Sequence, residues 1–359
     1  MTIITIIGAR PQFVKAAIVS HYIREHNACS SIRIDEHILH TGQHYDYNMS
    51  QIFFEQMDIP APEWHLGCTG SVEDMRDAII PIIADKADYV MVYGDTNSTL
   101  AGALAAEACN IPLIHIEAGL RSQNTAMVEE YNRIQTDQRA ALRFCPTTIA
   151  VANLQREGLT NGVYHVGDVM YDATLFFAAR STEYSSILKQ LNINKKEYYL
   201  ATIHRAQTTD NADCLANILR AFQQIQSPII LPIHPRTRKV IAHSPDLQEL
   251  VLKTPNLRVI DSVSYMEMLQ LERHASLIFT DSGGVQKEAY FHRVPCVTLR
   301  NETEWIETIE AGWNTLAGTD TARIIAAAGK PLIHPKEITE YGDGNAAKQI
   351  IQILCQNEY

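Results

Sequence analysis

Short apolar runs alternate with helical patterns along almost the whole chain. The strands expected from these runs are Thr2–Ile7, His37–His40, Tyr89–Tyr93, Leu113–Ile116, Val163–Val166, Tyr198–Ile203, Ile229–Ile233 and Leu277–Thr280. The helices expected between them include Gln12–His26, Ser98–Cys109, Ala212–Gln226, Met266–His274 and Val285–His292. Short continuous β-branched runs between helices are typical of parallel strands that are covered on both faces. The pattern therefore predicts an α/β protein with doubly wound, Rossmann-like sheets.

A chain of 359 residues suits two domains of ordinary size. The polar segment Gly167–Asp172 follows a short strand and is the expected break. We expect a first Rossmann-like domain over residues 1–167 and a second over 168–343, with a ligand cleft between them. The last helical pattern, at about 344–359, is expected to pack back on the first domain.

The overall composition excludes several classes of protein. Hydrophobic residues make up 46% of the chain and charged residues 20%, which predicts folded domains with real cores. The net charge of -11 opposes a nucleic-acid or anionic-membrane partner, and no apolar run is long enough to span a bilayer. Seven scattered cysteines without a C-x-x-C pair suit reduced thiols in a cytoplasmic protein and predict no metal site.

Reactive side chains follow the expected strands of the first half. Arg10 and Lys15 come after the first strand, at a helix start that offers free N–H groups to an anion. Asp95 follows another strand, where it could serve as a helix cap or as a functional carboxylate. Glu117 ends a buried strand, and an unpaired charge there would be costly.

A further group lies on the next expected helix. Glu129, Arg133 and Asp137 are spaced four residues apart and share one helix face. This spacing fits either a surface ladder of ion pairs or a carboxylate held in place by an arginine.

The second half ends its strands with a similar set. His204 and Arg205 follow one strand. Ser282, Gly283 and Gly284 follow another and begin a helix, with Ser282 as its cap. Without Cβ atoms, the glycine N–H groups can approach a diphosphate closely. The alternative is a helix start whose glycines serve packing alone. No Walker lysine or G-x-G-x-x-G fingerprint is present, which disfavours an NTPase or an NAD enzyme.

These motifs, in this order, resemble the non-hydrolysing UDP-N-acetylglucosamine 2-epimerase family over nearly the whole chain. The resemblance implies a GT-B-like fold, a homodimer and no cofactor. It implies inversion at C2 of a UDP-sugar by elimination of UDP, through a 2-acetamido-glucal, and re-addition. The active-site residues that it implies are Asp95, Glu117, Glu129, Arg133 and His204, and the substrate-binding residues are Arg10, Lys15, Ser282, Gly283, Gly284 and Glu288.

Several positions depart from the family's common pattern. Ala9 and Gln12 stand where Thr and Glu are typical, and Trp305 stands where an arginine is typical. The aromatic pair Tyr290–Phe291 also differs, as do Val128 for a usual proline and Gln207 for a usual glutamate. The first-loop, Trp305 and aromatic variants resemble the subgroup that epimerises UDP-2,3-diacetamido-2,3-dideoxy-glucuronate for bacterial surface polysaccharides.

Other functions share parts of this pattern. A GT-B glycosyltransferase has the same fold and donor but moves the sugar to an acceptor. A hydrolysing epimerase would release the free sugar, although its first-loop pattern is different. A UDP-sugar sensor without activity would be expected to have lost one of the carboxylates Asp95, Glu117 and Glu129, and all three are present.

Overall fold

The computed structural model describes residues 1–44, 51–122, 127–330 and 335–356. The chain forms two compact units, one made of Met1–Phe176 with Thr339–Tyr359 and the other of Phe177–Ile338. The boundaries expected at residues 167 and 343 stay a prediction about how the chain divides into folding domains.

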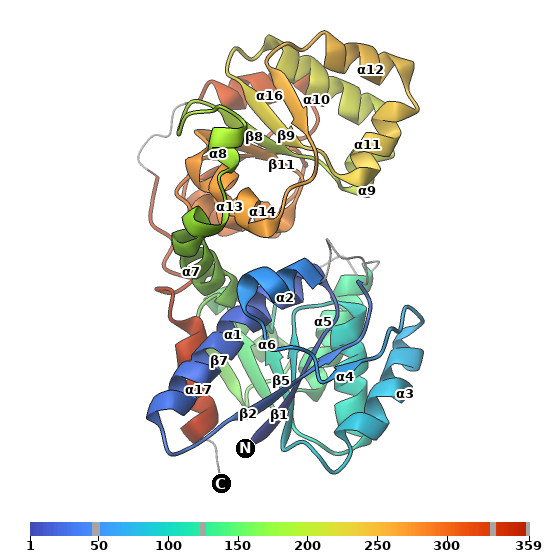
Figure 1. The fold of residues 1–359 in the computed structure, drawn as a ribbon, viewed down its shortest axis with the longest axis vertical. Coiled ribbons are helices and arrows are strands. Elements are labelled where there is room, and N and C mark those ends of the chain that lie inside the picture. The colour runs from blue at the N-terminus through green and yellow to red at the C-terminus, as the bar shows by residue number, and fades with distance from the viewer. Residues whose placement is uncertain (45–50, 123–126, 331–334, 357–359) are drawn as a thin grey trace. The chain divides into compact units, whose positions relative to one another are not determined.

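The described part of the first unit contains a seven-stranded parallel sheet in the order β3-β2-β1-β4-β5-β6-β7. Its strands are β1 (Thr2–Ile7), β2 (Asp35–His40), β3 (Trp64–His65), β4 (Tyr89–Tyr93), β5 (Leu113–Ile116), β6 (Leu142–Cys145) and β7 (Val163–His165). Its helices are α1 (Arg10–Cys29), α2 (Gln51–Met57), α3 (Val72–Ile83), α4 (Asn97–Ala108), α5 (Val128–Arg139), α6 (Thr148–Arg156) and α17 (Ala346–Gln356). α7 (Val169–Tyr184) begins in this unit and ends in the second. α17 lies beside α1, although the two are at opposite ends of the chain (Figure 1).

The second unit contains a six-stranded parallel sheet in the order β10-β9-β8-β11-β12-β13. Its strands are β8 (Tyr199–Thr202), β9 (Ile229–Pro232), β10 (Leu257–Ile260), β11 (Leu277–Thr280), β12 (Cys296–Thr298) and β13 (Asn314–Leu316). Its helices are α8 (Ile187–Gln190), α9 (Ala206–Thr209), α10 (Ala212–Gln224), α11 (Pro235–Ala242), α12 (Pro245–Leu252), α13 (Tyr265–His274), α14 (Gly283–Phe291), α15 (Ile306–Glu310) and α16 (Thr321–Ala328).

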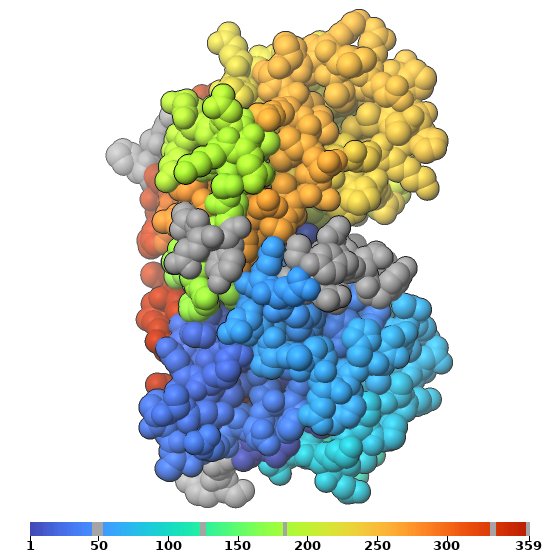
Figure 2. Space-filling view, viewed as in Figure 1, coloured from blue at the N-terminus to red at the C-terminus, as the bar shows by residue number. Residues whose placement is uncertain are grey.

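Burial explains why these segments form strands. The inner strands β4, β5 and β11 are buried along almost their whole length. In Figure 1, helices α1 and α2 lie over the sheet of the first unit, and the same blue segments form much of the visible face of this unit in Figure 2. Runs such as Leu277–Thr280 are fully buried, as expected for strands packed on both faces. The predicted α/β class with two Rossmann-like sheets is thus confirmed.

Strand order determines where each sheet can bind a ligand. The chain reverses direction across the sheet between β1 and β4 in the first unit, and between β8 and β11 in the second. In open parallel sheets, ligands bind outside the carboxyl ends of the strands at such switch points. Ligand sites are therefore expected at the segments that follow β1, β4, β8 and β11. Among the residues that the structure describes, none of the helices is long and apolar enough to cross a membrane.

Candidate active site

The turn after β1 is built on a buried amide side chain. Gln12 is 1% exposed, and its Oε1 accepts hydrogen bonds from the backbone N–H groups of Gly8 at 2.9 Å and Ala9 at 3.0 Å. Its Nε2 donates to the carbonyl of Tyr93 at 3.1 Å and to Thr99 Oγ1 at 3.0 Å. Gln12 therefore ties the first turn to the end of β4, on the other side of the switch point.

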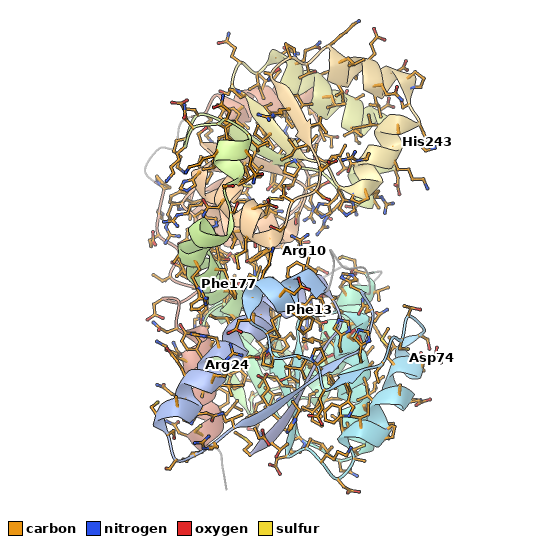
Figure 3. All side chains as sticks on the ribbon, viewed as in Figure 1. Arg10, Phe13, Arg24, Asp74, Phe177 and His243 are labelled. Atoms are coloured by element: carbon orange, nitrogen blue, oxygen red, sulfur yellow. The ribbon has the colours of Figure 1, made fainter. Side chains whose placement is uncertain are left out.

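The cations expected in this turn lie in different surroundings. Arg10 and Phe13 lie at the start of α1, and the Arg10 guanidinium is 5.6 Å from the centre of the Phe53 ring (Figure 3). Lys15 is buried, and its Nζ forms an ion pair with Glu117 Oε2. The helix thus presents one cation near its first residue and holds the other against a carboxylate.

Glu117 has an unusual backbone. It follows β5 directly and has φ of +71°, a left-handed conformation that glutamate rarely adopts. Such a conformation persists only where the surrounding structure holds it, and it is concentrated at functional sites. An atom built as a Cβ on Gly94 would lie 3.5 Å from Lys15 Nζ and 3.6 Å from Glu117 Oε2. The Lys15–Glu117 pair therefore lies against the residue that precedes Asp95.

Asp95 is held by an arginine from α5. Arg133 Nη2 is 2.5 Å from Asp95 Oδ2, and its Nη1 is 3.0 Å from Glu130 Oε2. Glu130 also accepts the backbone N–H of Ser122 at 2.8 Å. The spacing on α5 suggests that Arg133 orients Glu129. In the structure Arg133 instead contacts Asp95 and Glu130, because Glu130 points inward while Glu129 is exposed.

The helix face for which both a surface ladder of ion pairs and a carboxylate held by an arginine were considered reaches the interior at Asp137. Asp137 is 0% exposed and lies 2.7 Å from His115 Nδ1 on β5 and 2.7 Å from Arg121 Nη1. Burial raises the pKa of the Asp137 carboxyl, but the charges and hydrogen bonds of His115 and Arg121 outweigh it and hold the pKa below its usual value. Asp137 is therefore an ionised, buried carboxylate.

A cavity of about 390 Å³ opens at this edge of the first sheet. The residues that line it come from the segments after β1, β2 and β4 and from α5: Ala9, Pro11, Gln43, His44, Asp95, Thr96, Asn97, Val128, Glu129 and Asn132. Asp95 and the exposed Glu129 thus share one cavity, with Arg133 bound to the first of them.

In the second unit, the turn after β8 is held by a buried aspartate. Asp281 is 0% exposed and accepts the backbone N–H groups of His204 and Arg205, each at 3.0 Å. The ring of His204 lies 5.3 Å from that of His234 and keeps a partly exposed edge. Asp281 therefore fixes the backbone from which His204 projects.

The start of α14 follows β11 as expected, with one correction. Ser282 occupies the cap position, but its side chain makes no capping hydrogen bond. A Cβ on Gly284 would meet nothing closer than Ser282 Oγ at 3.9 Å, and one on Gly283 nothing closer than 3.6 Å. The fold itself thus leaves room for side chains at both glycines, which disfavours packing as the reason for them.

Charged and aromatic residues surround this helix start. The atoms nearest to a Cβ on Gly283 are Arg205 Nη2, Glu304 Oε2 and Trp305 Nε1, all at 3.6 Å. Burial alone would raise the pKa of Glu304, but the hydrogen bonds and charge of Arg300 hold it below its usual value. Lys287 Nζ lies 4.1 Å from the centre of the Trp305 ring. Glu288, further along α14, is 6% exposed.

No group of three or more His, Cys, Asp or Glu side chains is placed to hold a metal ion in the described ranges of the chain. Residues 27–355 match the model of a protein family described as UDP-N-acetylglucosamine 2-epimerase. The chain belongs to this family. The resemblance drawn from its motifs is therefore confirmed.

Similar proteins match this epimerase over nearly their full length. A Methanococcus maripaludis protein described as a UDP-N-acetylglucosamine 2-epimerase homolog is 46% identical over 99% of both chains. The UDP-2,3-diacetamido-2,3-dideoxy-D-glucuronate 2-epimerase of Pseudomonas aeruginosa is 45% identical over 99% of this chain and 100% of its own. The crystal structure of Methanocaldococcus jannaschii UDP-GlcNAc 2-epimerase with UDP-GlcNAc and UDP gives a TM-score of 0.83 at 37% identity, covering 99% of this chain and 100% of that one.

The predicted site residues of this epimerase fall into two groups. The first unit brings together Arg10, Lys15, Asp95, Glu117, Glu129 and Arg133 at one end of its sheet. The second unit carries His204, Ser282, Gly283, Gly284 and Glu288 on the segments after β8 and β11. Sequence reasoning missed the buried supports Gln12, Glu130, His115 and Asp281. For His115, the signal was a polar residue inside an apolar strand. The pattern carried no signal that separated Glu130 from its exposed neighbour Glu129.

Proposed function

We propose that this epimerase inverts C2 of a UDP-2-acetamido sugar by eliminating UDP and adding it back. The observation that carries the proposal is the group of carboxylates at the carboxyl end of the first sheet. Asp95 is paired with Arg133, and Glu117 is paired with Lys15 beside Gly94. Breaking and remaking a C2–H bond requires acid–base groups on both faces of the carbon, and this cluster supplies them.

Asp95, Glu117 and Glu129 each have different contacts around their carboxylates. Asp95 and Glu129 line the same cavity, but only Asp95 is in contact with Arg133. Glu117 is fixed by its left-handed backbone and by the cation of Lys15. Different surroundings around nearby carboxylates separate their proton affinities, which is how one site provides both an acid and a base.

The second unit suits the leaving group. Elimination places negative charge on the departing diphosphate, and backbone N–H groups at a helix start stabilise that charge. The start of α14 has no side chain at Gly283 and Gly284 that would block its N–H groups. His204 and Arg205, on the turn after the neighbouring strand β8, add polar groups at the same end of the sheet. Glu288 is proposed to accept hydrogen bonds from the ribose hydroxyls.

We propose UDP-2,3-diacetamido-2,3-dideoxy-glucuronate as the preferred substrate, ahead of UDP-N-acetylglucosamine. Identity is 45% with the Pseudomonas aeruginosa enzyme of that name, 46% with the Methanococcus maripaludis UDP-N-acetylglucosamine 2-epimerase homolog and 38% with the Methanocaldococcus jannaschii UDP-N-acetylglucosamine 2-epimerase. The first-loop, Trp305 and aromatic variants favour the diacetamido-uronate. The uronate carboxylate needs a cation, and Arg10 provides one at the start of α1. Its guanidinium carbon lies 5.6 Å from the centre of the Phe53 ring, and we propose that its N–H groups bind the uronate carboxylate.

The experiment is NMR of the product formed in deuterated water from each nucleotide sugar. We expect deuterium at C2 of a manno product that still carries UDP, and faster turnover of the diacetamido-uronate. Free sugar would identify a hydrolase, and turnover only with an added acceptor would identify a glycosyltransferase. Retention of the original C2 hydrogen would exclude elimination and re-addition.

Three broader properties complete the proposal. We propose a cytoplasmic homodimer that serves the synthesis of a surface polysaccharide, on the basis of the family resemblance. Light scattering should then give about twice the 40.3 kDa chain mass. Deleting the gene should remove a manno-configured sugar from the cell-surface polysaccharide. A monomeric mass or an unchanged polysaccharide would contradict the corresponding part.

A further inference from the structure

A buried histidine connects the two turns that carry Asp95 and Glu117. His115 lies on β5 and is 0% exposed. Its Nε2 is 2.8 Å from the carbonyl oxygen of Gly94, the residue that precedes Asp95. Its Nδ1 is 2.7 Å from Asp137 Oδ1. The ring therefore spans from the turn after β4 to helix α5.

Asp137 extends the connection to the turn after β5. Its second oxygen, Oδ2, accepts the backbone N–H of Gly119 at 3.1 Å and Arg121 Nη1 at 2.7 Å. Arg121 in turn makes two 2.7 Å bonds to the carboxylate of Glu157. One histidine–aspartate pair thus holds Gly94 on one side and Gly119 on the other.

Both turns need such support because their backbones are unusual. Gly94 has φ of +65°, Glu117 of +71° and Gly119 of +80°. A left-handed residue interrupts the regular hydrogen-bond pattern of its turn, and glutamate is sterically disfavoured in that region. Fixed partners on neighbouring elements are what keep such turns in place.

We propose that His115 and Asp137 form a positioning pair that fixes the carboxylates of Asp95 and Glu117 for proton transfer at C2. The pair touches no substrate and acts through the two turns. This inference rests on the proposed epimerase function for its effect on rate, but its effect on the turns is independent of that function.

The hydrogen-bonding roles of the pair follow from its partners. A carbonyl oxygen can only accept, so His115 Nε2 donates to Gly94. Nδ1 faces the carboxylate oxygen of Asp137, so both ring nitrogens of His115 lie against acceptors. An asparagine at position 137 would keep the shape of the carboxylate and could donate its amide N–H to Nδ1 while Nε2 still donates to Gly94.

Two variants of His115 each remove one of its two hydrogen bonds. His115→Asn retains a donor near the Nδ1 position and loses the bond to Gly94, and His115→Gln reaches toward Gly94 and loses the bond to Asp137. The control is His37→Asn, because His37 also bridges two acceptors, Glu63 at 2.6 Å and Asp35 at 3.2 Å, at a partly exposed position in the first half of β2.

Asp137 offers a test by rescue. In Asp137→Asn, the amide oxygen can still accept from Gly119 and Arg121, while the amide nitrogen donates to a neutral His115. Asp137→Ala removes all of these bonds. A positioning role therefore predicts that the asparagine variant keeps most of the wild-type kcat and that the alanine variant does not.

The measurements are kcat and KM on the active nucleotide sugar, and amide hydrogen exchange in the segments 94–97 and 117–121. We expect both His115 variants and Asp137→Ala to lose about 10- to 100-fold in kcat, the scale of a displacement near 1 Å, with KM changed less than about threefold. Exchange in at least one of the two segments should accelerate, and Asp137→Asn and His37→Asn should resemble the wild type in both readouts.

Two results would overturn the proposal. One is an unchanged kcat in folded His115 variants whose turns exchange faster, since the turns would then not need fixing. The other is a kcat loss in Asp137→Asn as large as that in Asp137→Ala, which would assign the effect to charge and not to position. Wild-type enzyme that converts no UDP-sugar would instead refute the proposed function, whatever the exchange data show.

Discussion

Asp172 gives the sharpest prediction about the stability of the first unit. This aspartate lies on α7, is 2% exposed, and accepts the backbone N–H of Ala347 at 2.7 Å. It thereby takes the place of a cap for α17, whose own first residues leave their N–H groups without helical partners. Burial, with the nearby charges of Asp168 and Asp343, raises the pKa of Asp172 from 3.8 to about 7 despite two backbone hydrogen bonds.

A raised folded-state pKa makes the protonated carboxyl the favoured form in the folded protein. The stabilisation from Asp172 is therefore fully present below pH 3.8 and is lost as the pH rises through about 7. Integrating the linkage relation between pH 5 and pH 8 for these two pKa values gives a loss of roughly 2 to 3 kcal/mol. Asp172→Asn has no charge to bury and should not show this loss.

The assay compares urea unfolding of wild type and Asp172→Asn at pH 5 and pH 8, with hydrogen exchange of the α17 amides as the local readout. Between pH 5 and pH 8, the free energy of unfolding of the variant should rise by about 2 to 3 kcal/mol relative to that of the wild type, whatever the difference between the two proteins at pH 5.

Asp74→Asn is the matched control. Backbone and side-chain hydrogen bonds from Ser71 lower the pKa of Asp74 below 3.8, so Asp74 is ionised in the folded and the unfolded state above pH 5. The difference in unfolding free energy between wild type and Asp74→Asn should therefore stay constant between pH 5 and pH 8. A wild-type-to-variant difference for Asp172 that changes by less than about 0.5 kcal/mol between pH 5 and 8 would refute the reasoning.

Three further changes test the site. Gly284→Val places a side chain where the structure has room but a diphosphate would approach, so calorimetry should show weaker UDP binding by a protein that still folds; unchanged affinity would remove the diphosphate from this turn. Asp95→Asn and Glu117→Gln should each lower kcat by about a hundredfold or more while UDP affinity changes much less, and a rate near wild type would exclude that carboxylate from the proton transfer. Gln12→Ala removes the hydrogen-bond acceptor of two buried N–H groups, so the free energy of unfolding measured with urea should fall by about 1 to 3 kcal/mol. A change near zero would show that water replaces the amide.

Eight of the thirteen strands in the described residues were predictable, because burial on both faces leaves a plain apolar run, whereas β3, β6, β10, β12 and β13 were not predicted. The segment expected at Tyr89–Tyr93 agrees with β4 residue for residue, and that at Leu277–Thr280 with β11. Helix starts were less certain: α1 begins at Arg10, two residues before the expected Gln12, because Pro11 suits the first turn of a helix.

The supports of the site could not be read in the same way. Spacing places Glu129 and Arg133 on one helix face, but it does not distinguish Glu129 from its neighbour Glu130, which is the one that turns inward. Asp137 fits a surface ladder equally well until the fold places His115 beside it. A pattern along one element carries no information about the partner that another element supplies, so the contacts across the switch point emerged only from the structure.

The return of α17 to the first unit has a consequence for how the chain is made. The helix buries Ala347, Ile350, Ile351 and Leu354 against that unit, yet it is separated from the rest of the unit by the whole of Phe177–Ile338. A ribosome adding 5 to 20 residues per second spends roughly 8 to 30 s on those intervening residues. During that interval the side of α1 that later contacts α17 is uncovered. The second unit, in contrast, is continuous in sequence and can fold as soon as it emerges. The first unit is therefore completed only after the second unit has been made, and until then the nascent chain carries an open surface that α17 later covers.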